Sequence, residues 1–343
     1  MEIVESDKLE MRKMGVKFLD ITDTPFAKDI ALLYAPKEYT YPAKLAHTKD
    51  IKNIVSKVDK KRLHTNLGVF SSFHTRYYKS DHGLASAQWL QKTIQQIIAS
   101  SNTTLDVEVV PFKHEWKQFS IIVKIPGSEV LSSDESIVVV GSHQDSVNLL
   151  FPSLFAAPGA DDDGSGTVTC LEALTLLLGA DFQPRNNVEF HFYSAEEGGC
   201  LGSLAIFAKY KEQHKAVVAM LQQDMTGYSA GSLEKGLPDH VGLITDYTNH
   251  NLNVFLKTTI EAVCDIDWME TKCGYACSDH SSASKFGYPS AFIIESTFEN
   301  SNHFIHSTQD TIDKLSFEHM AEHVKLTVGY AYELGMSDIK EQH

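Results

Sequence analysis

Residues 136–146 read SIVVVGSHQDS, and this stretch decides the fold class. The apolar run at 137–140 is typical of a strand buried on both faces, and polar side chains follow it at once. The same design recurs at 188–197 (VEFHFYSAEE), 216–224 (AVVAMLQQD) and 290–295 (SAFIIE). Helical spacing of apolar residues marks segments at 83–99, 165–178, 201–212, 252–264 and 317–331. Alternating strands and helices predict a single α/β domain whose mixed, mostly parallel sheet carries helices on both faces.

Composition excludes several classes of protein. The chain has 343 residues, of which 43% are hydrophobic and 22% charged, so it can build a core and is not a disordered chain. The net charge of −15 argues against a nucleic-acid partner. No apolar run approaches the roughly 18 residues of a membrane span, so we expect no membrane partner. The first residues lack the apolar core of a signal peptide, as they would in a secreted protein without its signal.

Histidines and carboxylates gather in the polar stretches that follow the apolar strands. In open α/β sheets the ligand crevice lies outside the carboxyl ends of the strands, so these stretches can converge. Taken singly, each residue is better explained as a hydrogen-bonded histidine, a turn or helix cap, or a solvated charge. Together, imidazole and carboxylate groups suit a pair of zinc ions in a hydrolase. The candidates are His143, Asp145, Asp161, Asp162, Asp163, Glu196, Glu197, Asp224 and His306.

Cysteines and one short motif bear on the cellular compartment. Cys273 and Cys277 are four residues apart, a spacing open to a local disulfide or to metal binding. No second thiolate pair lies nearby to complete a zinc set, so the disulfide is favoured. Residues 102–104 (NTT) fit a glycosylation acceptor, which is weak evidence for secretion.

Six ordered motifs carry a resemblance to a known family. The strings GSHQDS, PGADDDGSGT, YSAEEGGCLGS, QQDMTGY, CGYACSDHSS and FIHSTQDT occur in the order found in the M28 family of zinc aminopeptidases. The chain most resembles the secreted bacterial and fungal leucyl aminopeptidases, from about Tyr41 to the C-terminus. The resemblance implies the zinc exopeptidase fold for residues 41–343, with residues 1–40 as an N-terminal extension.

The resemblance also assigns roles to single residues. It implies two Zn²⁺ ions per chain, with Asp161 as the bridging carboxylate and a cis peptide bond between Asp161 and Asp162. Glu196 would be the general base that activates a water, Asp145 would hold the second ring nitrogen of His143, and Cys273–Cys277 would match a family disulfide. The remaining implied metal ligands are His143, Glu197, Asp224 and His306.

The implied activity is removal of N-terminal residues from peptides or proteins, with a preference for leucine and other large apolar residues. Met225, Tyr275, Phe298 and Ile305 adjoin the motifs and are candidates for the pocket of the first side chain, with ordinary core packing as the alternative. A secreted, monomeric glycoprotein made as a zymogen is expected.

Alternatives remain at this stage. Residues 17–23 (KFLDITD) resemble the end of a fungal propeptide, and an ordinary N-terminal arm is equally compatible. Rival functions are a carboxypeptidase, a single-zinc glutaminyl cyclase and a binding ectodomain without activity.

Overall fold

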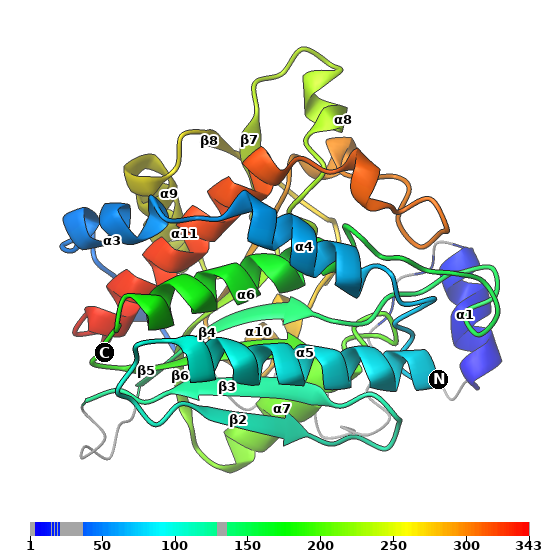
Figure 1. The fold of residues 1–343 in the computed structure, drawn as a ribbon. Helices are drawn as coiled ribbons and strands as arrows, with labels where there is room; N and C mark the ends of the chain where they lie inside the picture. Colours follow the sequence, from blue (N-terminus) through cyan, green and yellow to red (C-terminus); the bar gives the residue numbers. More distant parts are fainter. Residues whose placement is uncertain are drawn as a thin grey trace.

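The fold is organised around one eight-stranded sheet in the order β2-β3-β5-β4-β6-β9-β7-β8 (Figure 1). The computed structural model describes residues 4–14, 16, 18, 20, 37–128 and 136–342. The strands are β2 (Glu108–Phe112), β3 (Ser120–Ile125), β4 (Ser136–His143), β5 (Asn187–Tyr193), β6 (Ala216–Gln223), β7 (His240–Ile244), β8 (Asp267–Thr271) and β9 (Ser290–Ile294).

The centre of the sheet is parallel and its flanks are mixed. Strands β5, β4, β6 and β9 run parallel to one another. Strand β3 joins β5 antiparallel and β2 joins β3 antiparallel, while β7 runs antiparallel to β9. The carboxyl ends of the four central strands therefore meet at one edge. The predicted mixed, mostly parallel sheet is confirmed.

Helices cover both faces because side chains alternate along each strand. In β4, Val138 and Val140 belong to a large core cluster, and Ile137 and Val139 belong to a smaller one. The smaller cluster packs under α7 (Leu201–Glu212) and α10 (His280–Lys285). The larger cluster packs under α3 (Thr48–Val55), α4 (Lys60–Phe70), α5 (Asp81–Ser100), α6 (Gly164–Gly179), α9 (His250–Val263) and α11 (Phe317–Met336).

Several elements were not singled out by the sequence pattern. They include β7 and β8, which extend the sheet beyond β9. A two-stranded pairing of β1 (Tyr39–Thr40) with β10 (Lys340–Glu341) joins the start of the main domain to its end. The remaining short elements are α8 (Ala230–Leu233), η1 (Phe298–Asn300) and η2 (Ile312–Lys314).

The N-terminal extension contributes one described helix, α1 (Glu5–Lys13), drawn in blue beside the green loop that follows β4 (Figure 1). Of the propeptide-like residues 17–23, only Phe18 and Asp20 are among the described residues. No helix in the described ranges is long and apolar enough to cross a membrane.

Candidate metal centre

The strand ends bring the candidate ligands together as expected. His143 is the last residue of β4, Asp224 directly follows β6, and Glu197 lies four residues after the end of β5. His306 comes from the loop after η1 and has a positive φ of 58°. All but His306 are buried. Parallel pairing thus places ligands from distant parts of the chain at one edge of the sheet.

Two groups of three residues could each hold a metal ion, and they share Asp162. One oxygen of Asp162, Oδ1, lies 3.0 Å from Nε2 of His143. The other, Oδ2, lies 2.9 Å from Nε2 of His306. Asp224 Oδ1 completes the first group at 3.5 Å from His143 Nε2, and Glu197 Oε2 completes the second at 3.2 Å from His306 Nε2. A carboxylate with one oxygen in each group is arranged as a bridging ligand would be.

The aspartate that faces both histidines is therefore one residue later than the expected bridge. Asp161 points away, where its Oδ1 accepts hydrogen bonds from the Ser165 hydroxyl (3.0 Å) and the Gly227 N–H (3.1 Å). Its Oδ2 accepts a hydrogen bond from the Asn302 side chain at 2.9 Å. The expectation of Asp161 as the bridge is wrong in the structure, which places Asp162 there.

The cis peptide bond also lies one residue later than expected. It joins Asp162 to Asp163, not Asp161 to Asp162. The error arose because three consecutive aspartates in a turn carry no periodicity that tells their directions apart. The helix start was the available signal, since Asp163 is the N-cap of α6 and accepts the Gly166 N–H at 2.9 Å. The cap occupies the Asp163 side chain and leaves Asp161 and Asp162 as the candidates for the bridge.

Two further carboxylates hold the loops in place. Asp163 also accepts the N–H of His143 (3.0 Å) and of Met225 (3.1 Å), which ties the ends of β4 and β6 to α6. Asp310 accepts the backbone N–H groups of Asp161 and Asp162, at 3.0 and 3.1 Å. These two roles were missed by the sequence analysis, since each bond joins segments far apart in the chain.

Asp145 has two sets of neighbours. Its carboxylate accepts the backbone N–H groups of Glu196 (3.0 Å) and Glu197 (3.1 Å), and so orients that turn. Its Oδ1 also lies 3.5 Å from Nδ1 of His143, the nitrogen that it was expected to hold. The firmest bonds of Asp145 are thus to the glutamate turn.

Burial sets the electrostatics of the cluster. Desolvation raises the pKa of Glu197, and the nearby Asp162 adds to this while His306 opposes it. For Asp162 burial acts in the same direction, but hydrogen bonds from His143 and His306 prevail and lower its pKa. Asp224 Oδ1 and Glu197 Oε1 are buried without a hydrogen-bond partner. Unpaired buried carboxylate oxygens are costly, so this donor set fits bound cations.

Glu196 lies beside the ligands without belonging to either group. Burial raises its pKa well above the ordinary value, His143 opposes this, and the charges of Asp279 and Glu197 add to it. The Cys200 thiol donates to Glu196 Oε1 over 3.5 Å. A buried carboxylate at the edge of a cation site is placed as a general base would be.

Arg76 is a buried cation beneath the site. It has no exposed surface, and its guanidinium donates to the backbone carbonyls of Gln144 (2.8 Å), Gly159 (2.8 Å) and Pro158. Burial lowers its pKa to about 10, opposed by neighbouring aspartates, so it stays charged at neutral pH. Arg76 therefore links the stretch after β4 to the loop before Asp162, a role that its residue type does not predict.

A cavity with an apolar end opens beside the two candidate metal-binding groups. Its volume is about 260 Å³, and the expected pocket residues Met225, Tyr275, Phe298 and Ile305 all line it. Phe292 and Ile294 of β9 also line it and were missed, because they read as ordinary core of a buried strand. These apolar side chains pack with the cysteines of a disulfide, which makes this end of the cavity closed and apolar.

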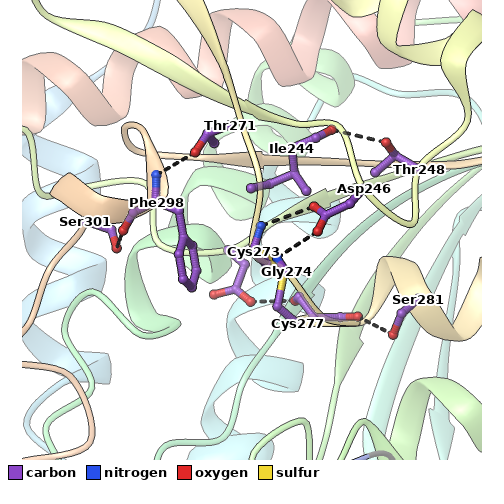
Figure 2. Close-up of a disulfide and its surroundings, with 12 residues drawn as sticks. Ile244, Asp246, Thr248, Thr271, Cys273, Gly274, Cys277, Ser281, Phe298 and Ser301 are labelled. Atoms are coloured by element: carbon purple, nitrogen blue, oxygen red, sulfur yellow. Dashed lines mark hydrogen bonds between the residues drawn. A yellow bond between two sulfur atoms is a disulfide. The ribbon is translucent and has the colours of Figure 1, made fainter. Parts of the chain in front are cut away.

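The predicted disulfide is present between Cys273 and Cys277. Figure 2 shows the Phe298 ring directed toward this loop. Asp246 accepts the backbone N–H of Cys273 (3.1 Å) and of Gly274 (2.7 Å), and the Phe298 N–H donates to Thr271 (2.9 Å). The loop that carries Tyr275 is therefore held at its start by Asp246 and closed by the disulfide.

The family follows from comparison with known proteins. The model of peptidase family M28 matches residues 120–331, which include both metal-binding groups. The chain belongs to this family. It is thus a peptidase, and the expected hydrolase class and family resemblance are confirmed.

Individual M28 relatives are similar in sequence to almost the whole chain. Leucine aminopeptidase 1 of Blastomyces gilchristii is 49% identical over 341 residues, covering 98% of this chain and 87% of the relative. Leucine aminopeptidase 1 of Fusarium vanettenii is 48% identical over 343 residues, covering 99% and 86%. Among solved structures, the LapA aminopeptidase of Legionella pneumophila superposes with a TM-score of 0.84 at 26% identity, covering 98% and 90%.

The N-terminal extension reaches the mouth of the M28 site. Arg12, Val16 and Phe18 line the same cavity as the metal-binding groups. The Arg12 guanidinium lies 3.8 Å from Oε2 of Glu197, and the Asp20 N–H donates to the Gly199 carbonyl at 3.4 Å. The segment therefore lies across the opening through which a substrate would enter.

Proposed function

We propose that the chain is a zinc-dependent aminopeptidase that removes leucine and other large apolar residues from the N-termini of peptides. The observation that carries the proposal is the position of Asp162, whose two oxygens face His143 and His306 at 3.0 and 2.9 Å. One zinc ion would be held by His143, Asp162 and Asp224, and a second by Asp162, Glu197 and His306. Bound there, the two ions would polarise the scissile carbonyl and acidify a water molecule.

The chain's own residues would transfer the proton and hold the general base in position. Glu196 would accept the proton of the attacking water and deliver it to the leaving amine, which its raised pKa favours. Asp145 would hold the glutamate turn through its two backbone hydrogen bonds. Cys200 would orient the Glu196 carboxylate through its thiol.

Charge and shape support an exopeptidase that acts at the N-terminus. Four carboxylates face the cavity, namely Asp162, Glu196, Glu197 and Asp224, and none of them can pair with a substrate carboxylate, which needs a cationic side chain. Among the described lining residues the one lysine or arginine is Arg12, which belongs to the N-terminal extension. A carboxypeptidase is disfavoured for this reason, and two complete ligand groups disfavour a single-zinc cyclase.

We propose further that residues 1–40 form a removable extension that covers the site, followed by the catalytic domain at 41–343. The contact of Arg12 with Glu197 supports a covering role. Secretion is supported by the disulfide, which persists in oxidising compartments, and by the exposed position of Asn102 in its acceptor motif.

A pair of chromogenic substrates tests the activity. Leu-p-nitroanilide should be hydrolysed by the zinc-loaded chain, while N-acetyl-Leu-p-nitroanilide should react at least about 100-fold more slowly, because acetylation removes the free amino group that a site for N-termini must bind. Gly-p-nitroanilide should also be slower, because it leaves the apolar pocket empty. Equal rates with free and acetylated leucine would overturn the assignment as an aminopeptidase.

A further inference from the structure

A loop next to the metal-binding groups exposes large apolar side chains. Leu150 is 61% exposed, Phe151 56% and Leu154 66%, all in the loop between β4 and α6. Scattered exposed apolar residues are normal, but several in one short loop beside a ligand cavity mark a binding surface.

The loop is held in a defined position. The Leu149 N–H donates to the backbone carbonyl of His306 at 3.2 Å, so the loop begins against a residue of the second metal-binding group. Asn148 closes it by accepting the Leu150 N–H and donating to the Ala156 carbonyl, both at 3.0 Å. The His74 ring is hydrogen-bonded to the Leu154 carbonyl, also at 3.0 Å. A loop fastened at four points presents its side chains in fixed directions.

A second cavity connects this loop to the site. It is lined by Tyr77, Tyr78, Val147, Pro152, Ser153 and Gly198 from the main domain, and by Lys8, Leu9 and Arg12 from the extension. Glu197 lines this cavity and the first one. The two hollows therefore share Glu197, and Pro152 and Ser153 of the apolar loop line the second.

The direction of a bound peptide follows from the closed end and the open side of the first cavity. The end of the first cavity at Phe292 and Ile294 is closed by core packing and suits a single side chain. The remainder of the peptide must leave by the open side, where Leu149, Gly199 and the extension line the cavity. That side leads past Glu197 into the second cavity.

We propose that Tyr77, Val147, Pro152 and the exposed loop residues bind the part of the substrate that follows the scissile bond, and favour an apolar or aromatic residue at its second position. The inference rests on the proposed function and specifies its substrate class as peptides with two consecutive apolar residues. Helix α1 occupies the same groove in the full chain, where Lys13 Nζ lies 5.8 Å from the centre of the Phe151 ring.

The test compares kcat/KM for Leu-Phe-Ala and Leu-Gly-Ala with the full chain. Coverage by α1 lowers the apparent affinity for both peptides by the same factor, so their ratio reports the groove alone. The Phe peptide should be favoured by roughly tenfold, from partial burial of one aromatic side chain. The double variant Phe151→Ser/Leu154→Ser should reduce this ratio to about twofold or less. Loss of the Lys13–Phe151 contact loosens α1, so the rate with leucinamide, which has no second residue, should stay the same or rise.

Val254→Ser provides the matched control, since Val254 is 48% exposed on α9, outside the loop between β4 and α6. It should leave the peptide ratio unchanged. Normal hydrolysis of leucinamide with an unchanged ratio in the double variant would overturn this inference and leave the proposed function intact. Absence of hydrolysis of both leucinamide and the peptides by the zinc-loaded wild type and by its Arg12→Ala variant would overturn the proposed function, and this inference with it.

Discussion

The neighbouring aspartates Asp161 and Asp162 should respond to mutation in opposite ways. Asp162→Ala removes the one carboxylate that faces both histidines, so each metal-binding group loses a ligand at once. A bound metal contributes several kcal/mol of transition-state stabilisation. Loss of about 4 kcal/mol corresponds to a fall of roughly 1,000-fold in kcat. The zinc content should fall from two ions per chain to below one.

Asp161→Asn should affect stability instead. The amide oxygen can still accept from Ser165 and Gly227, but the hydrogen bond from Asn302 to Oδ2 is lost. One buried hydrogen bond left unmade costs about 1–3 kcal/mol. We therefore expect a lower Tm with two zinc ions retained and kcat within a few-fold of wild type.

Zinc content is measured by elemental analysis after gel filtration, Tm by thermal denaturation, and kcat with Leu-p-nitroanilide. The reasoning is refuted if Asp162→Ala keeps two zinc ions and its rate, or if Asp161→Asn loses its zinc while its fold persists.

Four further variants at three residues probe the surroundings of the site. Glu196→Gln should keep two zinc ions and lose at least about 100-fold in kcat, since general-base catalysis contributes that much; wild-type kcat would remove Glu196 from the proposed mechanism. Arg76→Met should weaken zinc retention in a chelator competition, because it leaves three backbone carbonyls unpaired, and Arg76→Lys should restore part of it; equal retention in all three proteins would exclude a positioning role. Arg12→Ala should raise the activity of the full chain by loosening the extension from Glu197, whereas a fall would contradict the covering role.

The sequence predicts those parts of the fold and site that depend on local pattern. Continuous apolar runs followed by histidines and carboxylates locate the strand ends, because the carboxyl edge of a parallel sheet gathers them. His143, Glu197, Asp224 and His306 were found in this way and by resemblance, and the structure brings them together.

What the sequence could not predict depends on direction or on distant contacts. Asp161 and Asp162 differ only in which way a turn points them. Asp310 acts through hydrogen bonds to Asp161 and Asp162, which lie 149 and 148 positions earlier in the chain. Arg76 belongs to a residue type that is almost never fully buried unless it is paired, so nothing local marks it as internal.

Zinc titration of the metal-free chain tests the dinuclear centre most directly. Hydrolysis of Leu-p-nitroanilide is followed while zinc is added in sub-stoichiometric steps. With Asp162 shared between two groups, activity should rise until about two ions per chain are bound and then level off. A full rate reached at one ion per chain, with no second binding event, would contradict a bridged pair of metals at Asp162.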